Sequence, residues 1–354
     1  MQITRAVVTP VELSLRRPVR MAGLPEISHL TAVFVRLETR QGQTAWGCAI
    51  AHPTLTGEKP EDLIHICEEG AALAPDLHPT NIEYSLSELA LRVKASPAAM
   101  CAFDLAFHDL LGLMTGLPLY RLLGGYRNRI QTAATIHIGD LDDSVDLAVE
   151  RARHGFRMLK IKGGLDPDGD VRRTIAIHTA LPNVVLHLDA DGGYSVQDAI
   201  DVAHALKGTI ELFEQPTHAN LPVELRHVKE QCAVPIFADQ SQKDPASALE
   251  LATHHNVDGL IVRLSACGGL RRARQIDGIC QAARVSTMVS CYIEPALLIS
   301  AGLSLALSSS NVHYADLDGY LDLANDPSKG CFSLQDGWLV ASEVPGLGYS
   351  LELH

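Results

Sequence analysis

The stretch RMLKIKGGLDPDGDVRRTIAIHTALPNVVLHLDAD (residues 157–191) decides the fold. Two short apolar runs, RMLKIKGG and VVLHLDAD, flank a longer segment, an order that predicts parallel strands joined by a crossover helix. The same order repeats from about residue 130 onward, through QTAATIHIG, IELFEQP, VPIFADQS, GLIVRLS, STMVSCY and NVHYADLDG. These eight runs are the number of strands that a closed (β/α)8 barrel requires.

The segments between the strands carry signals of helix starts. Ser195 with Asp198 resembles a capping box, and Asp244 followed by Pro245 is an N-cap with a first-turn proline. The most apolar run, PALLISAGLSLALSSS, is too short to span a bilayer, so we expect a buried helix there.

The remainder of the chain does not alternate in this way. The first part predicts an α+β unit, with strands near 2–14, 30–39 and 44–50 and helices near 60–75 and 97–115. Asp-Gly in the tail segment FSLQDGWLV predicts a hairpin, and we expect this tail to pack back onto that first unit. We therefore predict an α/β protein with a (β/α)8 barrel (128–325), an N-terminal α+β domain (1–127) and a C-terminal segment (326–354) that returns to this domain.

Composition limits the partners of the chain. The 354 residues include 29 lysines and arginines against 42 acids, a formal charge of -13. Such a surface repels phosphate backbones and anionic membranes, so we expect no nucleic acid and no membrane as partner. The N-terminus has no signal-peptide pattern, and the 8 cysteines form no CxxC pair, which indicates a cytoplasmic protein. Helices on a barrel exterior often pair, and we expect a homo-oligomer.

Charged residues close successive predicted strands, at intervals of about 25 residues. In a barrel these strand ends meet at one mouth, where the active sites of such barrels lie. The residues are Lys160 and Lys162, Asp189, Glu214, Asp239, Arg263, and Asp316 with Asp318.

Three of these residues are acids on adjacent strands, Asp189, Glu214 and Asp239. Each alone is more simply a helix cap or a solvated loop residue. Three carboxylates held together need a counter-ion, however, and oxygen ligands of this kind suit Mg²⁺. The sequence therefore predicts one metal ion per site, with Mn²⁺ as a second possibility.

Lys160 and Lys162 lie two residues apart in one strand, so their side chains leave on the same face. We expect Lys160 and a nearby metal ion to lower the pKa of Lys162 towards that of a general base. Two surface lysines on an edge strand are the alternative.

Asp316 and Asp318 repeat this spacing with negative charge. Together they would receive a substrate ammonium group, or they cap the segment that follows. Glu294 is a weaker candidate for a residue that lines the substrate site.

As a set, these motifs resemble the enolase superfamily, and in particular its muconate-lactonizing branch. LKIKGG resembles the KxK motif, LDAD, FEQP and ADQS resemble the three metal-ligand strands, and DLDGYLDL is similar to the DxD motif of dipeptide epimerases. The segment AFDLAFHDLLGLMTGLPLYRLLGG resembles the end of the family's capping domain.

The resemblance implies a modified TIM barrel with an N-terminal α+β capping domain that the C-terminal segment completes. It also implies Mg²⁺ held by Asp189, Glu214 and Asp239, and removal of the proton next to a substrate carboxylate to give a metal-stabilised enolate. Lys162 would be the base, with Lys160 as its electrostatic helper. Asp316 and Asp318 would hold the free amino end of a dipeptide. Capping-domain loops near residues 17–28 and 51–58 would cover this small carboxylate substrate.

The chain departs from the family pattern at Arg263, where the resemblance implies a second lysine facing Lys162. A guanidinium stays protonated, so Arg263 is a poor base and a poor acid. Gln240 and Asp191 also replace the family's usual acid and asparagine.

Three functions remain open. The first is an isomerase that epimerises or racemises a dipeptide or an N-substituted amino acid. The second is a one-base lyase or cycloisomerase, with Arg263 as a fixed cation. The third is a non-catalytic protein that binds a metal and a carboxylate ligand.

Overall fold

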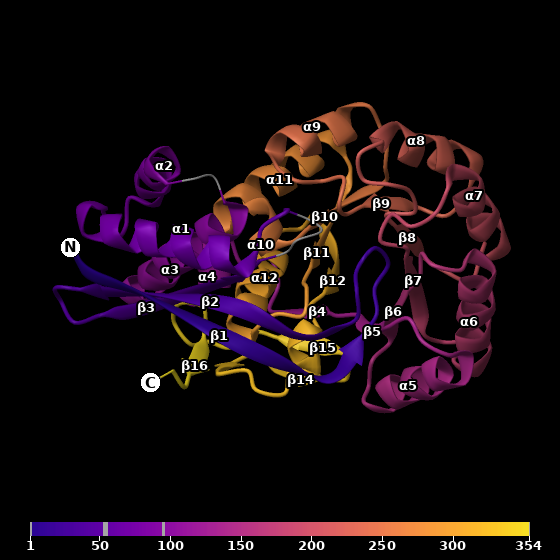
Figure 1. Ribbon diagram of the computed structural model, residues 1–354, viewed down its shortest axis with the longest axis horizontal. Coiled ribbons are helices and arrows are strands. Elements are labelled where there is room, and N and C mark those ends of the chain that lie inside the picture. The colour runs from indigo at the N-terminus through magenta and orange to yellow at the C-terminus, as the bar shows by residue number, and fades with distance from the viewer. Residues whose placement is uncertain (1, 52–55, 94–95, 354) are drawn as a thin grey trace.

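The central element of the fold is an eight-stranded parallel sheet. The structure is a computed structural model that describes residues 2–51, 56–93 and 96–353. Neighbouring strands follow the chain order from β5 to β12 (Figure 1). A parallel bridge from Thr132 to Ala315 joins the first and last strands. The strands are β5 (Ala134–Ile136), β6 (Met158–Lys162), β7 (Val185–Asp189), β8 (Leu212–Glu214), β9 (Ile236–Ala238), β10 (Gly259–Val262), β11 (Ser286–Ser290) and β12 (Val312–Asp316). The predicted barrel is confirmed.

Helices alternate with these strands and lie around the outside of the barrel (Figure 1). They are α5 (Leu141–Arg153), α6 (Pro167–Ala180), α7 (Val196–Ala205), α8 (Pro222–Gln231), α9 (Pro245–Thr253), α10 (Leu264–Cys267), α11 (Leu270–Ala283) and α12 (Ala296–Ser308). Within the described residues β12 is followed by a 3₁₀ turn, η2 (Gly319–Asp322), and not by an α-helix. This 3₁₀ turn, in place of a helix after the last strand, is a departure from the regular (β/α)8 pattern.

The predicted helix starts are confirmed by their hydrogen bonds. Ser195 accepts from the backbone N–H of Asp198 at the start of α7. Asp244 and Ser247 form a reciprocal capping box at the start of α9, with Pro245 in the first turn. Each cap satisfies backbone donors that have no partner inside the helix, so it sets where the helix begins. The apolar segment expected to be a buried helix forms α12, which is buried along nearly its whole length.

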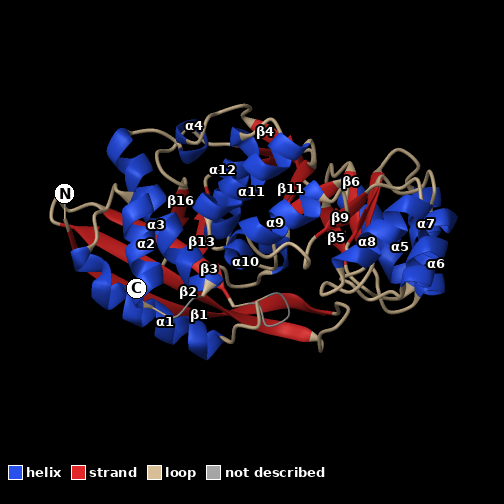
Figure 2. Cartoon of the chain, turned by 90° about the horizontal axis from the view of Figure 1, so that it is seen from above, coloured by secondary structure: helices blue, strands red, loops and turns tan. Residues whose placement is uncertain are grey.

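An antiparallel sheet and a group of helices precede the barrel. The strands of this antiparallel sheet are β1 (Ile3–Val19), β2 (Ile27–Thr39) and β3 (Thr44–Ile50), in that order. The helical elements are α1 (Pro60–Leu73), η1 (Ala74–Asp76), α2 (Ile82–Arg92), α3 (Pro97–Thr115) and α4 (Leu119–Leu122). Helix α2 was not predicted, since it buries only Ser85, Leu86 and Leu89. Figures 1 and 2 place this unit beside the barrel.

Helix α3 is the apolar centre of this N-terminal unit. Among the described residues it is the one helix with the length and hydropathy to cross a membrane, yet 78% of its apolar window is buried in the fold. It packs against β3, and Gly47 of that strand approaches the carbonyl of Ala102 so closely that a Cβ would collide with it. Helix α3 is therefore a core helix of the fold.

The C-terminal segment contacts both parts of the molecule. It contains β13 (Ser328–Gly330), β14 (Ser333–Gln335), β15 (Trp338–Val340) and β16 (Tyr349–Leu351). Strands β14 and β15 form the predicted hairpin, but β15 pairs with β4 (Arg129–Gln131), just before the barrel. The segment also returns to the N-terminal unit, as expected. Glu343 pairs with Arg121 of α4 at 2.8 Å, and the backbone N–H of Leu347 and the hydroxyl of Tyr349 donate to Asp109 of α3.

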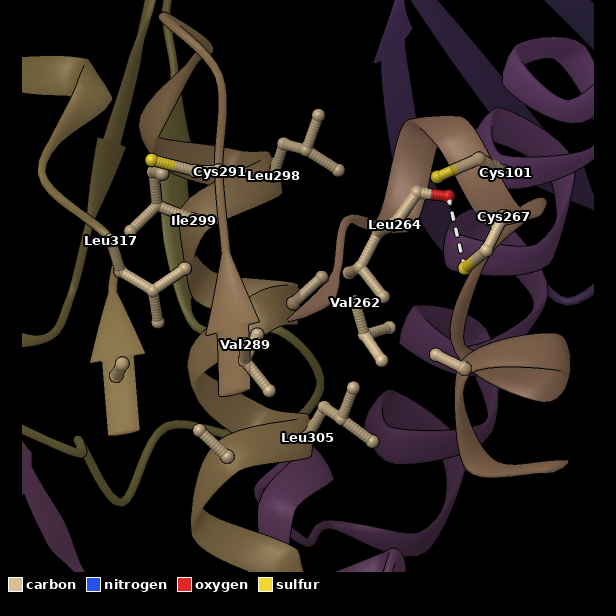
Figure 3. Packing of buried hydrophobic residues seen from close by; sticks show 14 of the residues in the cluster. Cys101, Val262, Leu264, Cys267, Val289, Cys291, Leu298, Ile299, Leu305 and Leu317 are labelled. Carbon is tan, nitrogen blue, oxygen red and sulfur yellow. Dashed lines mark hydrogen bonds between the residues drawn. The ribbon is translucent and has the colours of Figure 1, made fainter. Parts of the chain in front are cut away.

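One large hydrophobic core runs from the N-terminal unit into the barrel wall. Figure 3 shows part of it, where Val262, Val289 and Leu317 at the barrel strands face Leu298 and Leu305 of α12. Cys101 of α3 lies near Cys267 of α10, and the thiol of Cys267 donates to the carbonyl of Leu264 at 3.7 Å. This shared core holds the N-terminal unit against the carboxyl end of β10, where Arg263 begins α10.

Candidate active site

The strand register brings the predicted residues to one end of the barrel. Lys162 lies beside Asp189 across β6 and β7, and Asp189 lies beside Glu214 across β7 and β8. Asp316 ends β12 beside Ser290 of β11. The charged residues gathered here are almost entirely buried: Lys160, Lys162, Asp189, Glu214, Asp239, Arg263, Glu294, Asp316 and Asp318. Because so many charges lose water together, each must be balanced by its neighbours.

Lys160 is paired with an acid from the far end of the sheet. Its ammonium donates to Oδ2 of Asp316, and it lies 3.6 Å from Oδ2 of Asp189. Burial lowers the pKa of Lys160, but the carboxylates of Asp316, Glu214 and Asp189 together outweigh burial and raise it well above its ordinary value. Lys160 is therefore a fixed positive charge inside the barrel mouth.

Lys162 lies between two carboxylates. Its Nζ is 2.7 Å from Oδ2 of Asp189 and 2.9 and 2.8 Å from the two oxygens of Asp191. Burial lowers the pKa of Lys162, but Asp189 and Asp191 raise it above the ordinary lysine value. The expected lowering of this pKa depends on a metal ion as well as on Lys160, so it stays a prediction. Lys160, the neighbour expected to lower it, is largely neutralised by Asp316.

Arg263 follows β10 and lies against two of the three predicted metal ligands. Its Nε and Nη2 donate to the two oxygens of Asp239 at 2.9 and 2.6 Å, and Nη2 also donates to Oε1 of Glu214 at 3.0 Å. Its Nη1 donates to the carbonyl of Cys291 at 3.2 Å, and its Cζ lies 4.9 Å from the centre of the Tyr292 ring. Burial lowers the pKa of Arg263, whereas Asp239 and Glu214 raise it well above its ordinary value. It remains a cation here.

The donor set suits a hard divalent cation. Five carboxylates meet three cationic side chains, and the acids are Asp189, Asp191, Glu214, Asp239 and Asp316. Burial and the charge of Asp189 raise the pKa of Glu214, and its Oε2 is buried without a hydrogen-bond partner. Within the described part of the chain no three ligands stand ready around a common metal position. Arg263 holds one oxygen of Glu214 and both of Asp239, so these carboxylates are neutralised by a guanidinium in this structure.

The two aspartates of the DxD pair have different surroundings. Asp316 accepts a hydrogen bond from the ammonium of Lys160 and another from the hydroxyl of Ser290 at 3.0 Å. Asp318 accepts from the backbone N–H of Thr135 at 2.6 Å and from its hydroxyl at 3.2 Å. Burial raises the pKa of Asp318 to about 8, and the charge of Asp316 adds to this. Of the pair, Asp318 is the one whose side chain is not held by a cation.

A small cavity of about 30 Å³ connects these groups. Lys160, Lys162, Arg263, Tyr292 and Asp318 contribute to its wall. Met21, from the connection between β1 and β2, also lines it, which places that loop over the cavity as expected. The second loop expected to cover the substrate lies partly outside the described residues, at 52–55. Glu294 is buried and burial raises its pKa to about 8, but it does not line this cavity.

Three groups that position the charged residues were not predicted from the sequence. Tyr292 packs against Arg263, Ser290 supports Asp316 and Thr135 holds Asp318. Each lies in or just after a barrel strand, so its position on the strand could have been used to find it. Neutral side chains at strand ends are common, however, and carry no chemical signal by themselves.

Fold and site together define a class of protein, a barrel enzyme with a capping domain and an acid- and lysine-lined mouth. Comparison with known proteins gives the family. Residues 143–354 match the Enolase C-terminal domain-like family, and residues 3–124 match the Mandelate racemase / muconate lactonizing enzyme, N-terminal domain. The chain belongs to the enolase superfamily.

Individual relatives match over their full length. The chain is 34% identical to the hydrophobic dipeptide epimerase of Enterococcus faecalis, over 99% of this chain and 100% of the relative. It is 29% identical to the L-Ala-D/L-Glu epimerase of Bacillus subtilis, over 98% and 96%. A crystal structure of the dipeptide epimerase from Enterococcus faecalis, complexed with Mg and L-Leu-L-Tyr, matches with a TM-score of 0.95 at 33% identity, covering 99% of this chain and 100% of that one. Epimerases are isomerases, and the prediction of an enzyme of this family is confirmed.

Proposed function

We propose that this protein is an epimerase or racemase that acts on a dipeptide or an N-substituted amino acid, with Lys162 as the base. The observation that carries the proposal is the meeting of Lys162, Arg263 and Asp318 around one small cavity. A carbon acid next to a carboxylate is weak, so its base must act inside a site that is rich in positive charge. Full-length relatives that are epimerases support the same reaction type.

The residues of this chain would divide the work as follows. Lys162 removes the α-proton and gives an enolate, and it can do so only after giving up its own proton, since its ion pairs with Asp189 and Asp191 favour the ammonium form. Lys160, held by Asp316, keeps a positive charge near the developing negative charge. Asp318, held by Thr135, receives the substrate ammonium in its ionised form, which the positive charge of that ammonium favours.

The proposal includes a metal ion, Mg²⁺ or Mn²⁺, at Asp189, Glu214 and Asp239. These are three buried oxygen donors on adjacent strands, a set that suits Mg²⁺. When bound there, the ion would supply positive charge that stabilises the carboxylate oxygens of the substrate as proton abstraction proceeds.

A second candidate is a one-base lyase or cycloisomerase. It is favoured by Arg263, a residue that stays protonated at the position where epimerisation would need a second proton-transfer group. Four of its hydrogen bonds go to Asp239, Glu214 and the Cys291 carbonyl. In this version Lys162 acts alone on one face, and Arg263 remains a fixed cation.

Deuterium incorporation separates these functions. The full chain is incubated with Mg²⁺ in D₂O and a panel of dipeptides and N-substituted amino acids, and deuterium and configuration at the α-carbon are followed. Deuterium with inversion supports the epimerase. Deuterium with full retention, or loss of a group, supports the one-base reaction.

The control variant is Lys162→Ala. It should abolish exchange, and if exchange survives, the assignment of the base is wrong. If no substrate exchanges but ligands raise the melting temperature, the protein is a binder and the proposal fails. Lys207→Ala, on an exposed turn away from the barrel mouth, is a matched lysine variant that should keep the wild-type exchange rate.

A further inference from the structure

The guanidinium of Arg263 makes four hydrogen bonds to other residues of the protein. Three of its hydrogen bonds end on carboxylate oxygens, two on Asp239 and one on Glu214, and a fourth ends on the Cys291 carbonyl. The ring of Tyr292 lies near the guanidinium, and the residue is only 5% exposed. Paired donation to both oxygens of one carboxylate is the strongest geometry available to an arginine. The guanidinium is therefore the built-in counter-ion of Asp239 and Glu214.

The same oxygens are needed by a metal ion. Both oxygens of Asp239 and Oε1 of Glu214 accept from Arg263, and a second cation at this point would be repelled by the guanidinium. We propose that Arg263 and a divalent metal ion compete for Asp239 and Glu214, so that the metal binds only when the guanidinium is displaced. This inference rests on the metal site of the proposed function.

A cavity next to Arg263 has room for the displaced side chain. This cavity of about 260 Å³ is lined by Arg263 and Asp239 and also by Gln240, Gln242 and Arg272. Oε1 of Gln240 is buried without a hydrogen-bond partner, while its Nε2 donates to Asp191 at 2.9 Å. A buried acceptor without a partner is costly, and a guanidinium turned into this cavity would supply a donor. In this proposal the side chain of Arg263 moves from the metal ligands, where the structure places it, to a second position beside Gln240.

The test is metal affinity and not catalysis. Mn²⁺ binding to the full chain, first stripped with EDTA, is titrated by calorimetry and by the electron paramagnetic resonance signal of free Mn²⁺. Arg263→Gln should bind Mn²⁺ at least about tenfold more tightly than the wild type, because the competing charge-assisted hydrogen bonds are gone. Arg263→Lys, which keeps the charge but not the paired geometry, should lie between them and serves if the glutamine variant does not fold.

Two further variants locate the effect. Arg272→Gln removes the same charge from the same cavity without touching Glu214 or Asp239, so its Mn²⁺ affinity should stay within about twofold of the wild type, as expected for a screened charge. Adding Glu214→Gln to Arg263→Gln should remove the gain in affinity.

Two results would overturn the inference, and they differ. If the wild type binds Mn²⁺ as tightly as both Arg263 variants, competition is wrong while the metal site stands. If neither the wild type nor a folded Arg263 variant binds Mn²⁺, the metal site of the proposed function is wrong as well.

Discussion

Asp109 of α3 ties the C-terminal segment to the N-terminal unit. Its carboxylate accepts from the backbone N–H of Trp46 at 3.0 Å, from that of Leu347 at 2.9 Å and from the Tyr349 hydroxyl at 2.7 Å. Burial nevertheless raises the pKa of Asp109 from 3.8 to about 6, because loss of water outweighs these hydrogen bonds. Replacement by asparagine keeps the shape and removes the ionisation.

The expected magnitude follows from that pKa difference. The folded-state pKa lies above the unfolded one, so folding favours the protonated form. The resulting stabilisation is fully present below about pH 4 and is lost as the pH rises through about 6. Since each pKa unit corresponds to about 1.4 kcal/mol, the whole effect is about 3 kcal/mol.

Urea denaturation of the wild type and of Asp109→Asn between pH 4 and 8 measures this pH-dependent contribution of Asp109 to the free energy of unfolding. The wild type should gain about 3 kcal/mol relative to the variant as the pH falls across this range, with most of the change between pH 6 and 4. Other titrating groups cancel in the difference between the two proteins. A difference that stays constant within about 1 kcal/mol would show that Asp109 does not ionise in a buried junction, and would refute this reasoning.

Three further predictions concern the barrel mouth. Asp318→Asn should lower kcat/KM for substrates with a free ammonium about 10- to 100-fold, because a charge-assisted hydrogen bond is lost. N-acetylated analogues should be little affected, and equal losses for both kinds of substrate would contradict the ammonium site. Arg263→Lys should introduce deuterium with inversion in D₂O, since an amine can take and return a proton; unchanged stereochemistry would mean that more than the base is missing. Asp316→Asn should lower the free energy of unfolding by about 3–5 kcal/mol, because it leaves the buried ammonium of Lys160 without its counter-ion. A loss below about 1 kcal/mol in urea denaturation would show that another acid neutralises Lys160 in the variant.

Most of the fold could be predicted from local patterns. The alternation of short apolar runs with longer segments led to the barrel, and the caps at Ser195 and Asp244 marked helix starts that the structure confirms. These signals depend on neighbours a few residues apart, which a single chain displays directly. The pairing of β15 with β4 could not be predicted, because strand partners about 200 residues apart leave no mark in a local pattern.

The candidate site was partly predictable for the same reason. The charged residues at the strand ends were found because every parallel strand of a barrel ends at the same mouth. Their spacing did not say which charge would neutralise which. The pKa of Lys162 was expected to fall because of Lys160 and a nearby metal ion. The sequence did not show that the carboxylates of Asp189 and Asp191 also lie within 2.8 Å of its ammonium.

By itself, the sequence determined the family, the barrel and the residues that reach its mouth, since periodicity and residue type are properties of the chain. Only the tertiary structure decided the partners of those residues: Asp316 with Lys160, Asp191 with Lys162, and Arg263 with Asp239 and Glu214. The reason is that electrostatic energy in a buried site depends on distances of a few ångströms between strands. At that scale Arg263 changes from a missing base into the cation that holds two predicted metal ligands.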